Sequence, residues 1–275
     1  MSRSRQAVGP AIRTSAVVFP SAYTLHWQAM DWAQLIYALH GVMTVHASGG
    51  LWVIPPYQAM WVPAGHALRV EMGGRVSMRT LYFHTSLCSG LPATCRVVRV
   101  SPLLRELLLQ AVRLRTLDTH ERSERHLIDV LLDQLAVLPV APLDLPMPRD
   151  PRAARAAARA RATPHARLRL AELAKEAGAS PRTLERLFRA ETGLAVGAWH
   201  QRARMLRALE LLAAGEQVTR TSLSLGYESP SAFVAAFRRS FGTTPGRYFS
   251  SHRARGTKSP MPAAIGALRR SSIMP

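Results

Sequence analysis

The sequence predicts an α+β multidomain protein, with an N-terminal β-barrel that carries appended helices and a C-terminal domain made only of helices. Short β-like runs separated by turns fill the first third of the chain, and leucine-rich helical runs follow them. The second half holds two copies of a helix–turn–helix pattern. A length of 275 residues suits two ordinary domains, and a hydrophobic share of 48% excludes a wholly disordered chain.

Positive charge is concentrated in the second half of the chain. Lys and Arg total 36 against 17 Asp and Glu, which gives a formal net charge of +19. Residues 1–148 carry 13 basic and 9 acidic side chains, a net of +4, so residues 149–275 carry 23 and 8, a net of +15. This asymmetry predicts that the second half binds a polyanion.

Composition also excludes several classes of protein. Cys88 and Cys95 are too few for a disulfide framework or a thiolate zinc site, and we expect two ordinary thiols. No apolar run approaches the roughly 20 residues of a membrane helix. The run at residues 16–19 is far shorter than the roughly 7–15 residues of a signal-peptide core. We therefore expect a cytoplasmic protein without membrane association.

Residues 21–138 are predicted to form the barrel domain with its helices, after an N-terminal tail over residues 1–20. Runs rich in β-branched and aromatic residues, separated by Gly and Pro, are typical of a β-barrel or sandwich. The aromatic side chains here either line an apolar effector pocket or only fill the barrel. They are Trp27, Trp32, Tyr37, Trp52, Trp61 and Tyr82.

Two leucine-rich helices are predicted within residues 101–138. Ser101 and Pro102 suit the start of the first helix, as its cap and first turn. The leucine stripes either pack on the barrel or form the seam of a homodimer. Prolines recur over residues 139–151, which predicts an extended and poorly packed linker. Residues 253–275 are predicted to form a flexible tail.

The domain over residues 152–252 carries the functional pattern. Its first unit has a short helix from residue 170, a turn at residues 178–180, and a second helix whose start is set by Ser180 and Pro181. Leu184, Leu187 and Phe188 fall on the inner face of that helix. The outer face carries Arg182, Thr183, Glu185, Arg186 and Arg189. Such a unit places its second helix in the major groove of DNA, and Arg186 is the best candidate for a guanine contact.

The second unit repeats the plan over residues 218–239, and a long helix over residues 196–213 joins the two. That helix would space the units to enter successive major grooves. The DNA-facing residues predicted here are Ser229, Ser231, Val234, Ala235, Arg238 and Arg239. The three at base-facing positions (231, 234 and 235) cannot make a bidentate base contact, although a small apolar side chain can meet a thymine methyl. We expect the first unit to read most of the sequence, and the two arginines to clamp the backbone.

These residues resemble the AraC/XylS family of transcription regulators. Residues 226–233 (GYESPSAF) and 237–248 (FRRSFGTTPGRY) are similar to the family's C-terminal signature, and residues 177–188 to its first unit. Residues 61–65 (WVPAG), with the run from Gln34, resemble the cupin-like sensor domain of one branch of the family. In place of the usual Ile-Ala pair, the second unit has Thr221 and Ser222.

The resemblance implies a sequence-specific regulator of promoter DNA, controlled by a small-molecule effector in the cupin-like domain, with RNA polymerase as a partner. The alternatives are a metal-dependent cupin enzyme with a basic tail and a nonspecific DNA-binding protein. By analogy with related sensor domains, the metal ligands would fall at Gln28, Met30 and near Leu68, which are not hard-metal ligands. We therefore expect no enzyme activity, no cofactor and no metal, although the histidines leave a rearranged site open.

Overall fold

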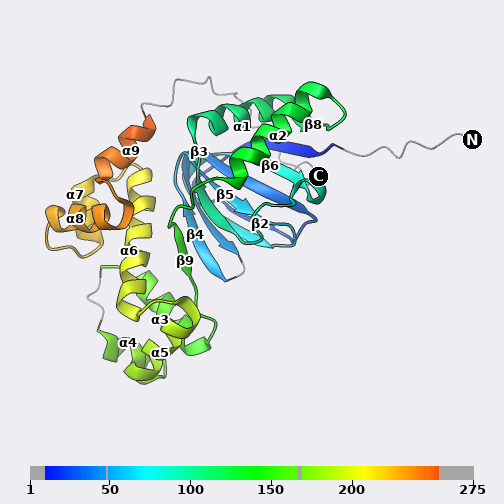
Figure 1. Cartoon of the computed structure of the whole chain (residues 1–275). Coiled ribbons are helices and arrows are strands. Elements are labelled where there is room, and N and C mark those ends of the chain that lie inside the picture. The colour runs from blue at the N-terminus through cyan, green and yellow to red at the C-terminus, as the bar shows by residue number, and fades with distance from the viewer. Residues whose placement is uncertain (1–9, 48, 166–168, 254–275) are drawn as a thin grey trace, which may run out of the picture.

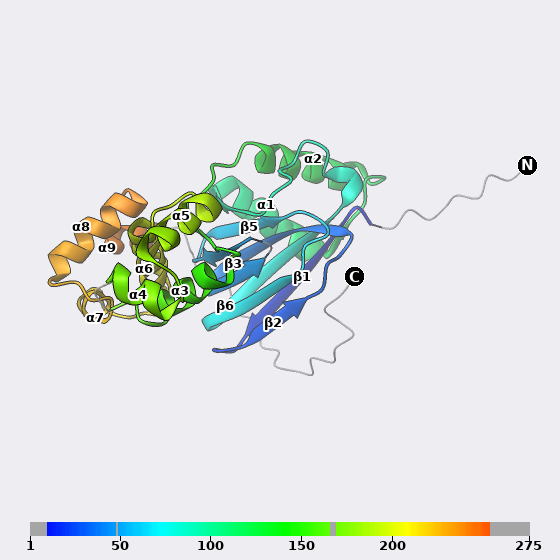
Figure 2. The same cartoon turned by 90° about the horizontal axis from the view of Figure 1, so that it is seen from below.

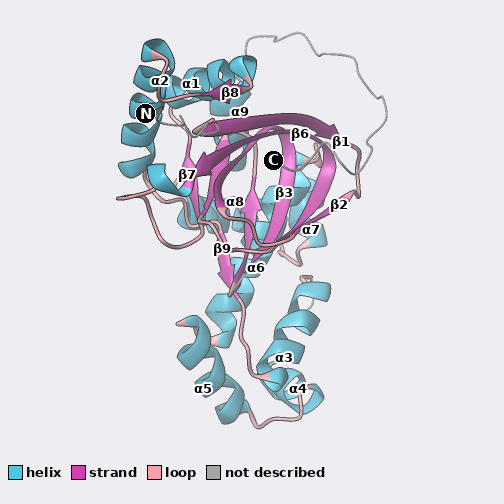
Figure 3. Ribbon diagram, turned by 90° about the vertical axis from the view of Figure 1, so that its right-hand side faces the viewer, coloured by secondary structure: helices cyan, strands magenta, loops and turns pink. Residues whose placement is uncertain are grey.

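The computed structural model describes residues 10–47, 49–165 and 169–253, so the expected flexible tail lies almost wholly outside the described residues. The N-terminal part is one strongly curved sheet with a barrel-like shape (Figure 3). Its strands are β1 (Ile12–Phe19), β2 (Thr24–Trp27), β3 (Trp32–Ala47), β4 (Gly50–Ile54), β5 (Gln58–Val62), β6 (Leu68–His84), β7 (Arg96–Arg99), β8 (Thr116–Leu117) and β9 (Asp144–Pro146).

The long strands β3 and β6 give the sheet its curvature. Strand β3 pairs with β5 over its first half and with β4 over its second, while β6 pairs with β1 and β2 in the same divided way. The β3–β6 register shifts between Ala38 and Val42. Gly41 lies at this shift with φ of 78°, and a Cβ there would stand 2.5 Å from the Arg75 carbonyl oxygen. Only glycine allows this close approach.

The first strand corrects the prediction of an N-terminal tail over residues 1–20. Strand β1 pairs with β6 along its whole length, from Ile12 opposite Phe83 to Phe19 opposite Val76. Ile12 and Phe19 are fully buried, but the residues between them are half-buried or exposed. Because only the two ends of the strand are fully buried, its sequence lacks the alternation that marks a half-buried strand.

Two helices cover one face of the sheet, α1 (Pro102–Leu114) and α2 (Arg122–Ala136) (Figure 1). As predicted, Ser101 caps α1, and its hydroxyl accepts a hydrogen bond from the Leu104 amide at 3.1 Å. The buried members of the stripes, which include Leu108 and Leu131, pack with side chains of the sheet. The buried leucines of the two stripes therefore pack on the barrel. Four large apolar side chains of this region remain exposed: Leu103, Leu114, Val130 and Val137.

The second domain is helical. It consists of α3 (Pro151–Ala162), α4 (Leu170–Glu176), α5 (Pro181–Thr192), α6 (Val196–Ala213), α7 (Val218–Ser224), α8 (Pro230–Phe241) and α9 (Pro245–Arg253). The long helix α6 carries α3, α4 and α5 at one end and α7, α8 and α9 at the other (Figure 1). Seen from below, this domain lies at one side of the barrel, away from α2 (Figure 2). Within the described ranges, no helix is both long and apolar enough to cross a bilayer.

The proline-rich linker is packed, which corrects the prediction of a poorly packed segment. Strand β9 lies within it and pairs with β4, and Leu143 and Leu145 are each only 1% exposed. On its other side the linker contacts α6. Trp199 donates from Nε1 to the Pro146 carbonyl at 2.7 Å, and Arg202 donates from Nε to the Asp144 carbonyl at 2.6 Å and pairs with the Asp144 carboxylate. The linker is extended, as expected, but it is packed between the two domains.

Candidate nucleic-acid interface and interdomain cavity

The first helix–turn–helix unit is α4, a turn at Gly178 and α5. Gly178 has φ of 71°, a conformation that favours glycine, and it lets the chain reverse between the two helices. The Ser180 hydroxyl then caps α5 by accepting a hydrogen bond from the Thr183 amide at 3.1 Å. Leu184 and Phe188 are fully buried against the rest of the domain. The orientation of the outer face of α5 is therefore fixed.

That outer face presents Arg182 and Arg186, one helical turn apart. Both side chains are exposed, and neither has a hydrogen-bond or ion-pair partner among the residues that the structure describes. Arg189 is also exposed and lies 3.7 Å from the Glu185 carboxylate. Two unpaired guanidinium groups at this spacing are suited to guanine edges or phosphates.

Two other predicted contacts on α5 are already engaged inside the domain. Glu185 is half-buried, and its carboxylate accepts a hydrogen bond from the Val196 amide at the start of α6, at 3.4 Å. Thr183 is half-buried as well, and its hydroxyl lies 2.9 Å from that of Ser180. Both side chains therefore support the unit from within more than they extend from its surface.

The second unit is α7, a turn at Gly226 and α8. Gly226 has φ of 71°, and a Cβ added there would stand 2.2 Å from the His165 carbonyl oxygen, so the segment before α4 packs directly on this turn. The Ser229 hydroxyl caps α8 by accepting from the Ala232 amide at 3.1 Å. Thr221 and Ser222 are fully buried, and Ser222 donates to the Thr219 carbonyl at 2.7 Å. A bond to the helix backbone thus satisfies one of the two buried hydroxyls.

The outer face of α8 differs chemically from that of α5. Ser231 and Ala235 are exposed and Val234 is half-buried, while Arg238 and Arg239 are exposed in the last turns. With Pro230 and Thr244, these five line a shallow hollow on the surface. The predicted surface residues of the second unit thus lie together, except that the Ser229 hydroxyl is occupied by its cap.

The basic run before the first unit, residues 152–161, is largely engaged within its own domain. Arg155 donates to the Ala177 carbonyl at 2.8 Å, and Arg159 pairs with Glu176 at 3.0 Å. Arg152 pairs with Asp150 at 2.9 Å. These arginines join α3 to α4 and to the linker, so less of their charge is available to phosphates than the sequence indicates.

The six aromatic residues predicted as an effector pocket do not share one cavity. Trp27 and Trp52 belong to the core inside the barrel, whereas Tyr37 and Trp61 belong to the core beneath α1 and α2. Trp32 is half-buried, with the Arg13 guanidinium 4.9 Å from its ring centre, and Tyr82 is buried. Successive residues of a strand point to opposite faces of a sheet, so side chains near in sequence reach different compartments.

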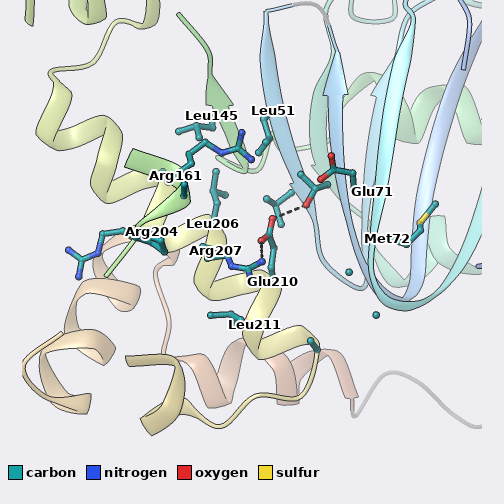
Figure 4. A pocket seen from close by; sticks show the side chains of 18 of the residues that line it. Leu51, Glu71, Met72, Leu145, Arg161, Arg204, Leu206, Arg207, Glu210 and Leu211 are labelled. Carbon is teal, nitrogen blue, oxygen red and sulfur yellow. Dashed lines mark hydrogen bonds and ion pairs between the residues drawn. The ribbon is translucent and has the colours of Figure 1, made fainter. Parts of the chain in front are cut away.

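A cavity of about 650 Å³ lies instead between the barrel and the helical domain, and none of those six residues lines it. Its barrel wall comes from β2, β3, β4 and β6, and its other wall from the end of α3 and from α6 (Figure 4). The Thr44 hydroxyl donates to Glu210 Oε1 at 2.8 Å, and Arg207 pairs with Glu210 Oε2 at 2.7 Å. The Thr44–Glu210 hydrogen bond therefore joins the two walls through the side chain that also holds Arg207.

Three other charged side chains line the cavity. Glu71 pairs with Arg69 at 3.0 Å, and Arg204 donates to the Leu225 carbonyl at 3.0 Å. Arg161 points from the end of α3 toward the barrel (Figure 4). Desolvation lowers the pKa of Arg161, although Glu210 and Glu71 attract its charge. Within the described ranges it has no hydrogen-bond or ion-pair partner. Sequence analysis missed this site because its walls come from segments far apart in the chain.

Metal-binding side chains are dispersed in the described part of the barrel. No group of three or more His, Cys, Asp or Glu there, or elsewhere in the described residues, has an arrangement that would hold a metal ion. His46 lies 3.3 Å from the Glu71 carboxylate, which already pairs with Arg69. Cys88 and Cys95 are both free thiols.

Comparisons with known proteins agree with this two-domain arrangement. Residues 18–136 match the family described as the AraC-like ligand binding domain, and residues 173–251 match a family described as a helix-turn-helix domain. The HTH-type transcriptional regulator NimR of Escherichia coli (strain K12) is 34% identical over 217 residues, which cover 79% of this chain and 79% of NimR. The regulatory protein SoxS of Salmonella typhimurium is 36% identical over 77 residues, 28% of this chain and 72% of SoxS.

Two solved structures resemble the chain to different extents. ToxT from Vibrio cholerae is 10% identical and covers 87% of this chain and 98% of its own, with a TM-score of 0.38. The DNA-binding domain of AdpA, in complex with a target DNA, is 35% identical and covers 39% of this chain and 96% of its own, with a TM-score of 0.36.

The relation to NimR extends over both domains, and the family matches assign a function to each of them. The chain therefore belongs to the AraC/XylS family of transcription regulators, with a cupin-like ligand-binding domain at its N-terminus and a DNA-binding helix-turn-helix domain at its C-terminus.

Proposed function

We propose that this regulator recognises promoter DNA mainly through α5, and that an effector in the interdomain cavity controls how the barrel holds α6. One observation carries the proposal. The helix that joins the two DNA-binding units also forms a wall of the cavity and bears Glu210, which bonds to the barrel. A ligand between these walls would therefore act directly on the element that sets the relative position of the two units.

On the DNA side, Arg186 is proposed to contact a guanine, with Arg182 on the adjacent base or phosphate. Both are exposed, neither has a partner in the described part of the chain, and the start of their helix is fixed by the Ser180 cap. Arg238 is proposed to contact a phosphate, because it lies in the last turn of α8.

The DNA test compares two arginine variants on operator and random DNA. Arg186→Ala should cost about 1–3 kcal/mol on the operator and relax base preference at one position. Arg238→Ala is the matched control and should weaken binding to all sequences alike, with a salt slope smaller by about 1. An equal loss on all sequences for Arg186→Ala would contradict base recognition. If the wild-type protein also lost its preference for operator over random DNA at about 0.2 M salt, a nonspecific binder would be favoured. Nonspecific attraction to DNA fails at salt concentrations of about this order.

On the sensor side, the effector must bind the active and inactive arrangements with different affinity. A thermal-shift screen of small metabolites on the full chain would find candidates. Ala203→Phe narrows the cavity from a half-buried position on α6, so it should abolish the shift produced by a true effector. Ala198→Phe adds the same side chain at an exposed position of the same helix and should leave the shift intact. Hits that survive Ala203→Phe would place the effector elsewhere.

We also propose that the protein is a cytoplasmic homodimer that uses α1 and α2 as its seam. The exposed apolar side chains of this region, such as Leu103 at 53% exposure, support the proposal. Leu103→Arg should shift the sedimentation of the chain from dimer to monomer, whereas unchanged sedimentation would reject this seam. Contact with RNA polymerase is proposed from the family alone.

A further inference from the structure

The hollow on α8 has a chemistry that is unusual for the outer face of a recognition helix. Small side chains line much of it, with Val234 half-buried and Ala235 exposed, and Ser231 lies one helical turn before Ala235. The opposite face of α8 buries Phe233 and Phe237, so the helix cannot rotate to hide the small residues. A small apolar surface is therefore held outward in a domain that binds DNA.

The polar groups around the hollow are unsuited to reading base edges by paired hydrogen bonds. The nearby Ser229 hydroxyl is occupied as the cap of α8. Arg238 and Arg239 lie in the last turns, whereas helix–turn–helix proteins contact bases with the N-terminal part of the recognition helix. In the described structure neither arginine has a hydrogen-bond or ion-pair partner, so both charges can meet phosphates that flank the hollow.

We propose that α8 recognises thymine C5-methyl groups in the second half-site of the operator. The methyl group of thymine is the one apolar feature of the base-pair edges in the major groove, and Ala or Val can contact it. Val234 and Ala235 form the contact surface, and Arg238 and Arg239 neutralise the neighbouring phosphates. The proposal rests on the DNA-binding mode described above and gives the second unit base preference as well as backbone clamping.

The two half-sites should then differ in chemistry. The α5 half-site contains a guanine recognised by hydrogen bonds, while the α8 half-site contains thymines recognised by apolar contact. Charge complementarity favours DNA as the occupant of the hollow, because Arg238 and Arg239 line it beside the small side chains and no acidic side chain of the described residues does.

The test first selects bound sequences from random DNA with the full chain. Each thymine of the second half-site is then replaced by deoxyuridine, which lacks only the C5-methyl group. We expect the affinity to fall about fourfold for each contacted methyl, the fold-change that corresponds to about 0.8 kcal/mol for burying one such group. Deoxyuridine outside the half-sites is the control and should have no effect.

A variant chain links the effect to α8. Val234→Ala should bind wild-type operator more weakly and lose most of its sensitivity to deoxyuridine at one position, so the two changes together cost less than their sum. Circular dichroism would confirm that the variant is folded. A selected second half-site without enriched thymine, or deoxyuridine effects below about 1.5-fold throughout, would overturn the proposal. A loss of base preference in Arg186→Ala would still support the first half-site in that case.

Discussion

The packed linker leads to a quantitative prediction about stability. Leu143 is 1% exposed in the core between the barrel and the helical domain, while Val140, three residues earlier, is 54% exposed. Leu-to-Ala substitutions in a core cost about 2–5 kcal/mol, because apolar contact is lost and a cavity remains. For a domain of roughly 150–250 residues, 1 kcal/mol lowers the Tm by about 2–4 °C. Leu143→Ala should therefore lower the Tm by about 10 °C.

Val140→Ala is the matched control, since it shortens an exposed side chain of the same segment. Surface substitutions of this kind change stability by about 0.5 kcal/mol or less, so its Tm should stay within about 2 °C of the wild type. Differential scanning calorimetry of the full chain measures both variants. Equal Tm values for Leu143→Ala and Val140→Ala would refute the packed linker and indicate that residues 139–151 are loosely packed.

Two further predictions concern the helical domain. Burial, and to a smaller extent Arg204, lowers the pKa of His200 from 6.5 to about 4. The unfolded chain binds a proton at His200 near pH 6.5, whereas the folded chain binds it only near pH 4. The free energy of unfolding should therefore fall by about 3 kcal/mol as the pH drops through that window. Urea titrations of His200→Leu should lack this pH dependence. Gly226→Ala should disrupt the second unit and weaken its DNA affinity, since the added Cβ would stand 2.2 Å from the His165 carbonyl oxygen. Gly242→Ala is the control: Gly242 has φ of 76° but open space around it, so this change should cost only about 1 kcal/mol. Similar urea midpoints for the two variants would contradict the close packing at Gly226.

Local chemistry explains why parts of the fold were predictable from sequence. Ser101, Ser180 and Ser229 each precede a proline, and each caps the helix that the sequence places there. Such caps depend on three or four neighbouring residues, so no tertiary information is needed. The outer faces of α5 and α8 follow from the same registers, which is why most of the predicted DNA-facing side chains lie on the surface.

The features that sequence analysis missed depend on partners that are distant in the chain. The linker is buried only because β4 and α6 lie on either side of it. Strand β3 is buried on both faces over residues 33–39, so its sequence shows no apolar–polar alternation, and the pattern of the strand alone could not assign Tyr37 to the core beneath α1 and α2. The wall-to-wall bond between Thr44 and Glu210 joins residues that no local signal relates.

The packing of β9 against both domains has a consequence for protein engineering. Sensor domains of relatives are natural candidates for exchange, and a proline-rich segment invites the cut. Here Asp144 and Pro146 accept hydrogen bonds from Arg202 and Trp199 of α6, while Leu145 packs in the core with side chains of the barrel. A chimaera spliced inside this segment would keep only part of the contacts that the linker makes with the barrel and with α6. A chimaera that transplants residues 139–150 together with the α6 residues that contact them would keep the two domains connected.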